Sequence, residues 1–205
     1  SFGGASGSLT ITPASVGSGV NLPSLGTNEQ YGSVCYGKGI YVVSKYKSVS
    51  PYTVSKIAVS TDNGSTWSDS TIPTMDIGGH QAVISCAYGS SMDKFVLLGS
   101  FGSSYATDTT AYSTDAITWS AGGNLPAVDN WRGVVYGGGK FIAYKDGGFA
   151  YSTNGTTWSS GSFGSFSPAS LSLAYGNGVW IGCSTGNGYG TYRSLDGGST
   201  WSQCL

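Results

Sequence analysis

Charge is scarce in this sequence, because charged residues make up only 9% of its 205 residues. The nine lysines and arginines are scattered along the chain, so no basic stripe can neutralise a phosphate backbone. No apolar run approaches the roughly 18 residues that a membrane-spanning helix requires. Residues 1–10 also lack the basic region followed by an apolar one that marks a signal peptide. We therefore expect no nucleic-acid partner and no membrane span.

Histidine and cysteine are few as well. The chain has one histidine and four cysteines, and the cysteines form no CxxC pair. Because neither residue type shows the spacing of metal ligands, we expect no metal and no cofactor. A chain of this length does not depend on a disulfide framework. We interpret the cysteines as buried apolar residues, with a disulfide as the alternative. They are Cys35, Cys86, Cys183 and Cys204.

Aromatic residues and glycine are abundant instead. Aromatic residues reach 13%, and there are 34 glycines. Disordered chains are poor in aromatic residues and rich in charge, so this composition indicates a folded protein. Glycine, serine and tyrosine favour many short strands joined by tight turns over helices. Since the length suits one domain with its own core, we expect a single all-β domain.

Two short markers recur four times along the chain in the same order. The first is an apolar run that ends in Tyr-Gly, at residues 36–37, 88–89, 136–137 and 175–176. The second is a polar turn that ends in tryptophan, at residues 60–67, 113–119, 152–158 and 194–201. Successive tryptophans of these turns are 52, 39 and 43 residues apart. A repeat of about 20 to 50 residues is typical of a solenoid or a propeller.

The third unit shows how each repeat divides into strands. Its apolar and aromatic runs predict strands at 133–136, 140–144 and 148–152, and Trp158 opens a fourth. Four strands in about 40 to 50 residues match one propeller blade. The sequence therefore predicts an all-β fold: a small β-propeller of about four four-stranded blades. The expected blades lie at about 31–80, 81–130, 131–169 and 170–205.

The closure of such a ring is less directly predicted. Residues 20–36 parallel residues 123–136, which indicates that the chain enters the first blade from the end of a fourth strand. We expect residues 1–30 to form an N-terminal segment that completes or extends the last blade, with Gly7–Val16 pairing with the C-terminal strand. The alternative is an open arc that closes only through oligomerisation.

The turns before the tryptophans resemble Asp-box repeats, also called BNR repeats, with the pattern S-x-D-x-G-x-x-W. The first and last copies match in full, the two middle copies are one residue shorter, and Asn154 replaces the aspartate in the third. The resemblance covers about residues 31–205. It implies a β-propeller with the boxes between third and fourth strands, and a structural role for Asp62, Trp67, Asp115, Trp119, Asn154, Trp158, Asp196 and Trp201. The family includes sialidases, other glycosidases, receptors and assembly factors, so it implies no single activity.

The residues argue against the catalytic members of this family. Sialidases use three arginines, a tyrosine paired with a glutamate, and an aspartate. This chain has two arginines, Arg132 and Arg193, and one glutamate, Glu29. Other glycosidases need a pair of carboxylates, and the loop candidates are Asp108, Asp129 and Asp146, for which solvated loop residues are the favoured interpretation. We therefore expect no enzymatic activity and no catalytic residue.

A binding surface is expected on the face of the propeller opposite the boxes. Tyrosine and tryptophan beside asparagine, aspartate and serine suit recognition of a sugar or a protein loop, although the aromatic residues could equally pack within the fold. The candidate ligand-binding residues are Tyr46, Tyr52, His80, Tyr105, Asp108, Trp131, Arg132, Lys145, Asp146, Asn187 and Tyr189.

The composition also resembles that of Asp-box domains in bacteriophage structural proteins, including tail fibres and surface decorations. This resemblance implies a non-enzymatic virion-surface or extracellular module that binds a glycan or a protein on a cell surface. A purely structural protein that caps or cements an assembly is the first alternative. A glycoside hydrolase is the second. Other virion proteins, or another copy of this chain, are further possible partners.

Overall fold

The computed structural model describes residues 21–25, 27–47, 56–73, 75, 83–99, 109–127, 129–164, 171–184 and 190–204. The regular elements in these ranges are sixteen β-strands. The first eight are β1 (Glu29–Gly37), β2 (Ile40–Lys47), β3 (Lys56–Ser60), β4 (Ser68–Thr71), β5 (Val83–Gly89), β6 (Lys94–Gly99), β7 (Thr109–Ser113) and β8 (Ser120–Asn124). The others are β9 (Trp131–Gly137), β10 (Lys140–Lys145), β11 (Gly148–Ser152), β12 (Ser159–Gly161), β13 (Ser172–Gly176), β14 (Val179–Ser184), β15 (Gly190–Ser194) and β16 (Ser202–Cys204).

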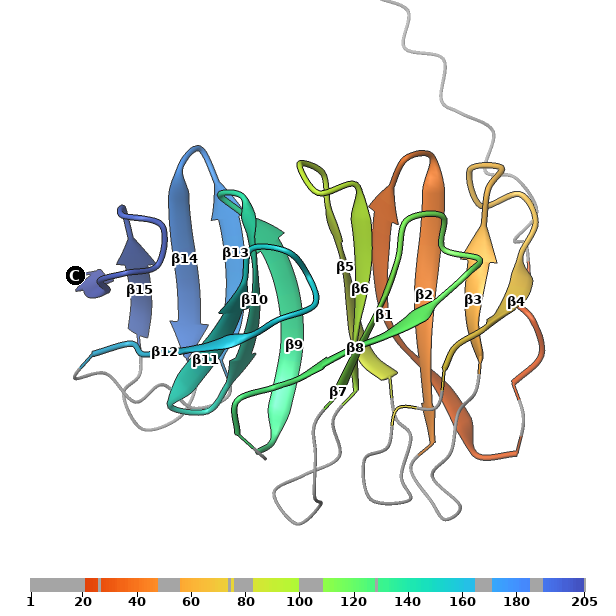
Figure 1. Ribbon diagram of the computed structural model, residues 1–205, viewed down its shortest axis with the longest axis horizontal. Helices are drawn as coiled ribbons and strands as arrows, with labels where there is room; N and C mark the ends of the chain where they lie inside the picture. Colours follow the sequence, from red (N-terminus) through yellow and green to blue (C-terminus); the bar gives the residue numbers. More distant parts are fainter. Residues whose placement is uncertain are drawn as a thin grey trace, which may run out of the picture.

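The strands form four sheets of four strands each, and each sheet follows chain order (Figure 1). We call them blade 1 (β1–β4), blade 2 (β5–β8), blade 3 (β9–β12) and blade 4 (β13–β16). Neighbouring strands in every blade are antiparallel. Up-and-down sheets of this size are propeller blades. The predicted all-β fold is therefore confirmed.

The repeat markers predict the strand boundaries closely. In blade 3 the expected strands 133–136 and 140–144 lie within β9 and β10, and 148–152 coincides with β11. The first strand of each blade ends at the glycine of a Tyr-Gly marker. Each Asp-box lies in the turn between the third and the fourth strand, as the resemblance implied.

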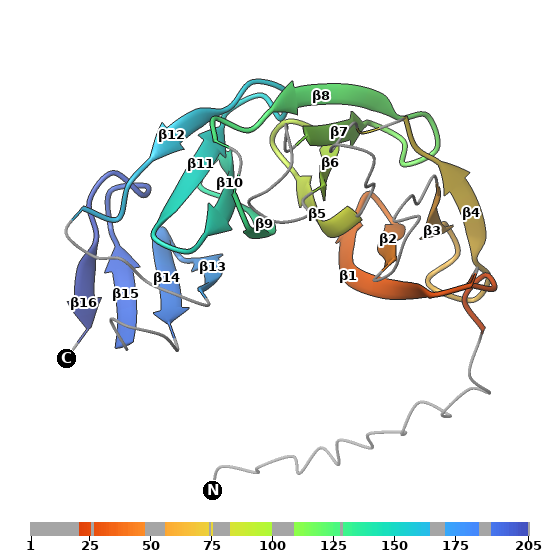
Figure 2. The same cartoon turned by 90° about the horizontal axis from the view of Figure 1, so that it is seen from below.

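The blades pack face to face along an arc, in chain order (Figure 2). A cluster of buried apolar side chains lies between blades 1 and 2, a second between blades 2 and 3, and a third between blades 3 and 4. Val42, Val96 and Ile142 occupy the same position of the second strand in blades 1 to 3, and all are 0% exposed. Each blade thus buries one face against the blade that follows it.

The Tyr-Gly markers are part of these contacts. In blades 1 to 3 the glycine at the end of the first strand lies against aromatic rings of the next blade, so that Gly37 meets Tyr88, Gly89 meets Phe141 and Tyr136, and Gly137 meets Tyr175. A Cβ on Gly37 would lie 2.1 Å from Cγ of Tyr88, and one on Gly137 would lie 2.2 Å from Cγ of Tyr175. Glycine is required here because the neighbouring ring occupies the space that any side chain would need.

The described part of the molecule does not close into a ring. It contains no fourth cluster that joins blade 4 to blade 1, and Figure 2 shows an opening between them. The expected pairing by Gly7–Val16 lies outside the described residues. Within the expected segment 1–30, residues 21–25 form no strand and β1 begins at Glu29. The described residues form an open arc, and the closure by residues 7–16 stays a prediction.

The cysteines match their expected environment only in part. All four are free thiols, and Cys86 is buried, whereas Cys183 is exposed. The expectation of a buried apolar residue is wrong for Cys183, because this side chain lies on the face of blade 4 that no blade of the described residues covers. Cys35 and Cys86 lie together between blades 1 and 2, and a hydrogen bond with Cys86, together with burial, raises the pKa of the Cys35 thiol well above its ordinary value.

Truncation of a box tryptophan tests how far the blade contacts stabilise the fold. Trp201 is 9% exposed and packs edge-on against Phe163, with ring centroids 5.0 Å apart, in the cluster between blades 3 and 4. We expect Trp201→Ala to lower the free energy of unfolding by about 3 to 5 kcal/mol, the usual cost of a cavity of this size. Denaturant unfolding measures this change. Leu195→Ala is the control in the same turn, because Leu195 is 66% exposed; equal losses would show that the cluster is not what stabilises the blades.

Candidate functional site

The Asp-boxes are turns stabilised by their own side chains. In the first box, Asp62 accepts a hydrogen bond of 2.8 Å from the backbone N–H of Thr66 and one of 2.6 Å from the Thr66 hydroxyl. The hydroxyl of Ser60 donates to the same carboxylate at 2.8 Å and accepts from the N–H of Gly64 at 2.9 Å. The tryptophan closes the turn, since Nε1 of Trp67 donates to the carbonyl of Gly64 at 3.1 Å.

These hydrogen bonds favour the ionised carboxylates. Bonds from the side chain and backbone of Thr66, with a further bond from Ser60, lower the pKa of Asp62 from 3.8 to about 2. Backbone N–H groups of Thr118 and Ile117 lower the pKa of Asp115 to about 2 in the same way. These hydrogen bonds of the carboxylates all lie within their own turns, so they stabilise the turns themselves.

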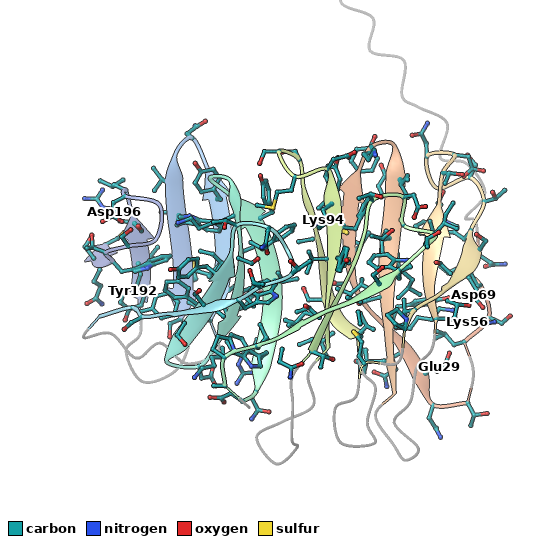
Figure 3. The ribbon with its side chains drawn as sticks, in the orientation of Figure 1. Glu29, Lys56, Asp69, Lys94, Tyr192 and Asp196 are labelled. Atoms are coloured by element: carbon teal, nitrogen blue, oxygen red, sulfur yellow. The ribbon has the colours of Figure 1, made fainter. Side chains whose placement is uncertain are left out.

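Lysines join the second, third and fourth boxes to the preceding blade. Nζ of Lys38 donates to the carbonyl of Thr114 at 3.2 Å, and Nζ of Lys94 donates to the carbonyl of Asn154 at 2.7 Å. Nζ of Lys140 donates to the carbonyl of Gly197 at 2.7 Å. The boxes lie with these lysines along one face of the arc, and Figure 3 shows Asp196 on that face, with Glu29 at the opposite ends of the strands.

The opposite face of blade 3 carries a cluster of alternating charges. Nε and Nη2 of Arg132 donate to the two carboxylate oxygens of Asp146 at 2.7 and 2.5 Å. Nζ of Lys145 donates to Asp129 at 2.7 Å. Burial alone would raise the pKa of Asp129, but the hydrogen bond and charge of Lys145 lower it. The structure thus brings together three predicted binding residues, Arg132, Lys145 and Asp146, as paired charges.

Two other predicted binding residues have partners within the fold. Trp131 is 4% exposed, packs in the cluster between blades 2 and 3, and donates from Nε1 to the carbonyl of Ala127 at 3.0 Å. Its ring is therefore not free to stack on a ligand, as the packing alternative foresaw. The hydroxyl of Tyr46 donates to Oε1 of Gln30 at 2.5 Å. The remaining predicted residues lie outside the described part of the chain: Tyr52, His80, Tyr105, Asp108, Asn187 and Tyr189.

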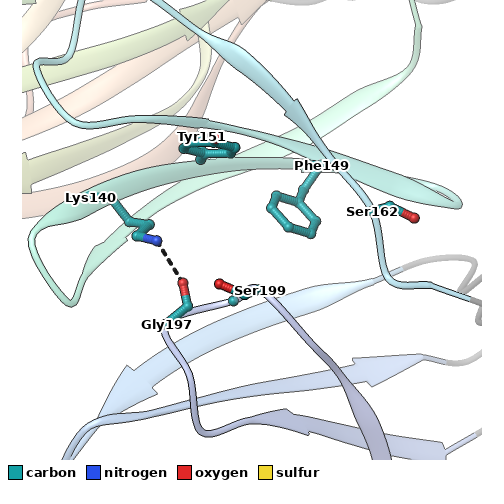
Figure 4. A pocket seen from close by; sticks show the side chains of 8 residues that line it. Lys140, Phe149, Tyr151, Ser162, Gly197 and Ser199 are labelled. Atoms are coloured by element: carbon teal, nitrogen blue, oxygen red, sulfur yellow. Dashed lines mark hydrogen bonds between the residues drawn. The ribbon is translucent and has the colours of Figure 1, made fainter.

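A groove of about 280 Å³ lies elsewhere, between the outer strands of blade 3 and the box of blade 4 (Figure 4). Phe149 and Tyr151 of β11 form its aromatic wall, and Nζ of Lys140 lies 5.5 Å from the centre of the Tyr151 ring. The rest of the lining is polar or lacks a side chain, and consists of Gly161, Ser162, Gly197, Gly198 and Ser199.

The composition of this groove suits a polar ligand with one apolar face. Tyr151 offers part of an aromatic ring, while Ser162 and Ser199 are exposed and carry hydroxyls that can donate and accept. The volume is at the small end of ligand sites, so the groove fits a single ring of a longer ligand. These residues are not predictable as a site from the sequence, because the groove forms only where two blades meet. One feature of the sequence that could have indicated the groove is a lysine and a tyrosine repeated at the same positions of two blades, Lys94 with Tyr112 and Lys140 with Tyr151.

The described residues show neither a metal site nor a membrane helix. No group of three or more histidine, cysteine, aspartate or glutamate side chains within them could hold a metal ion. None of the elements in the described ranges is a helix long and apolar enough to cross a membrane.

The four blades have the fold of a β-propeller, and the turns between their third and fourth strands resemble Asp-boxes. No family model and no curated protein sequence matches the chain. Solved structures share the fold: Ycf48 bound to a D1 peptide matches with a TM-score of 0.59 and 14% identity over 88% of this chain. Ycf48 from Cyanidioschyzon merolae matches with a TM-score of 0.56 and 15% identity, also over 88%. A mutant Trypanosoma rangeli sialidase with trans-sialidase activity matches with a TM-score of 0.55 and 14% identity over 84%.

The matched proteins are longer than this chain. It spans 54% and 57% of the two Ycf48 chains and 37% of the sialidase. At these identities the similarity establishes the propeller fold and leaves the function open.

The depressed pKa of the box carboxylates predicts acid sensitivity. A carboxylate whose pKa is lower in the folded state stabilises the fold above its unfolded pKa, and this contribution is lost as the pH falls through the folded value. For Asp115 the window runs from about pH 4 to about pH 2. We expect the free energy of unfolding, measured in urea, to fall across this window. Asp115→Asn, which copies the asparagine of the third box, should fall less steeply; an unchanged slope would contradict the role of this carboxylate.

Proposed function

We propose that this protein is a non-enzymatic binding module that recognises a glycan on a cell surface. The observation that carries the proposal is the groove between blades 3 and 4, where Tyr151 faces Ser162, Ser199 and Lys140. Sugars present apolar C–H faces and rings of hydroxyls, so they bind an aromatic ring that has hydroxyl and ammonium groups beside it. The scarcity of charge elsewhere on the chain favours a neutral ligand over a strongly charged one.

The location that we propose is the surface of a virion or the outside of a cell, as in a phage tail fibre or decoration protein. Support comes from the low charge and the abundance of glycine, serine and tyrosine that the chain shares with such proteins. A protein partner in place of a glycan is part of the same proposal. One structural neighbour is bound to a peptide and another is a sialidase, so this fold accommodates both kinds of ligand.

The carboxylates support a non-enzymatic role. A glycosidase needs a carboxylic acid whose pKa is raised so that it can donate a proton near neutral pH. Within the described residues, every carboxyl group with a resolved shift has a lowered pKa, and these are Asp62, Asp69, Asp93, Asp115, Asp129 and Asp196. Asp146, which is a candidate for the hydrolase alternative, is held by Arg132 through two hydrogen bonds.

A structural role is the second candidate function. Blades 1 and 4 each have one face with no neighbouring blade among the described residues (Figure 2). Such faces suit a protein that caps or cements an assembly. In that case the chain would dock stably to a capsid or tail protein and would bind no glycan.

A glycan array tests the proposal with the purified chain. We expect saturable binding to a neutral glycan and a loss of at least about tenfold in affinity for Tyr151→Ala, because one ring contact is worth on the order of 1 to 2 kcal/mol. Tyr112→Ala is the matched control, since Tyr112 occupies the same position in blade 2 and also lies beside a lysine.

Three outcomes would count against the proposal. Equal losses in both variants would show that the groove is not the site. No binding to any glycan, combined with stable docking to a virion protein, would favour the structural role. Turnover of a glycan that Asp146→Asn or Asp108→Asn abolishes would make the protein a hydrolase. Denaturant unfolding of each variant separates lost binding from lost structure.

A further inference from the structure

The outer face of blade 1 has the apolar pattern of a face that receives another blade. In blades 2, 3 and 4 the first strand places Cys86, Val134 and Leu173 against the preceding blade, with 6%, 3% and 7% exposure. Val34 occupies this position in β1 and is 62% exposed. An apolar residue is thus kept at a position where nothing in the described chain covers it.

The outer face of blade 4 has the complementary pattern. Val42, Val96 and Ile142 are completely buried by the blades that follow them. Ile181 holds the same position in β14 and is only partly buried, and Cys183, two residues further on, is exposed. Blade 4 therefore presents the surface that blades 1 to 3 use to bind the next blade.

The outer faces of blades 1 and 4 carry complementary halves of a Tyr-Gly contact: an exposed tyrosine on blade 1 and an uncovered glycine on blade 4. A Cβ on Gly37, Gly89 or Gly137 would collide with aromatic side chains of the next blade. The fourth glycine, Gly176, has no described atom within 4 Å of the corresponding Cβ position, so it meets no tyrosine of the described residues. The first tyrosine, Tyr36, is 53% exposed and has no preceding glycine to cover. Tyr36 and Gly176 are the two halves of the one such contact that the described chain leaves unmade.

The first Asp-box shows the same deficit. Ala116, Gly155 and Gly198, in boxes 2 to 4, are buried against the preceding blade, whereas Gly64 in box 1 is only partly buried.

Arg193 lies on the outer face of blade 4, directly opposite Ile181 in the strand register, and is exposed. It replaces Tyr151 of blade 3, whose neighbour Lys140 binds the carbonyl of the next box. If a blade 1 packed on this face, the Arg193 guanidinium could donate to a backbone carbonyl of its box, as Lys140 does to the box of blade 4.

We propose that a second copy of this chain docks head to tail on the first, with blade 1 of one copy packed on blade 4 of the other. Tyr36 then lies over Gly176, Val34 packs near Ile181, and Arg193 faces the first box. This contact continues the three interfaces within the chain, which use the same positions. A head-to-tail contact closes a ring when its rotation allows. Since propellers commonly have about 4 to 8 blades, two four-bladed copies form an eight-bladed ring with two identical interfaces. This proposal is independent of the glycan site.

Light scattering of the full chain gives the first test. We expect a particle of twice the 21.0 kDa chain mass. In the same particle, alkylation of Cys183, followed by mass spectrometry of its peptide, should be at least about tenfold slower than in a single chain. A single-chain mass at about 100 µM would overturn the proposal, because the two faces would then be left uncovered or be covered by the chain itself. A larger or open-ended assembly would overturn the closed ring.

Two variants test the contact itself. Val34→Glu alters blade 1 alone, and Gly176→Tyr alters blade 4 alone at a position with open space in the single chain. Each should raise the dissociation constant by about 10- to 100-fold, as overpacked or charged contacts do. Leu195→Glu is the matched control, because Leu195 is 66% exposed in the fourth box, which contacts blade 3, and should leave the dimer intact. Unfolding curves establish that each variant is folded.

A mixture of the two variants identifies the geometry. Val34→Glu leaves blade 4 intact, and Gly176→Tyr leaves blade 1 intact, so one interface of a mixed pair contains no substitution. We expect the mixture to form a two-chain particle that neither variant forms alone. Failure to associate on mixing, or a dimer that both single variants retain, would contradict the head-to-tail contact.

Discussion

The arrangement of the molecule depends on the close contact between successive blades. A single propeller blade cannot cover its own apolar face, so each blade is stabilised by its neighbours. The contact repeats three times with the same parts: a buried valine or isoleucine in the second strand, an aromatic ring over a glycine, and a box joined by a lysine. The direction of the arc and the position of each box follow from this contact.

The Asp-boxes let a chain with little charge form precise turns. Each box carboxylate or amide is satisfied by donors within about four residues, so it needs no distant partner. Because the turns are self-contained, the tryptophan that ends each one is free to pack elsewhere. Trp119 and Trp201 join the buried clusters between blades, whereas Trp67 has no preceding blade and is only partly buried. The same repeat therefore supplies both the turn and the contact.

The repeat made the fold predictable, because it fixes the spacing of strands and turns. Residues 148–152, the Tyr-Gly strand ends and all four boxes lie where the sequence indicated. The binding site was less predictable. Trp131 is the kind of aromatic residue that often contacts a ligand, yet its ring is buried between blades 2 and 3. The sequence does not show which side chains between two blades point into that contact. The groove at Tyr151 was missed because its walls come from two blades whose relative position only the structure supplies.

The most direct test of the account is the role of the glycine under the tyrosine. Gly137→Ala and Gly176→Ala are compared by denaturant unfolding in a Val34→Glu background, so that association contributes nothing. A Cβ at Gly137 would lie 2.2 Å from Tyr175, whereas one at Gly176 has open space. The account predicts that Gly137→Ala lowers the free energy of unfolding by about 1 to 3 kcal/mol, as overpacking does, and that Gly176→Ala does not lower it. Equal effects of the two substitutions would contradict the claim that tyrosine over glycine sets how the blades pack.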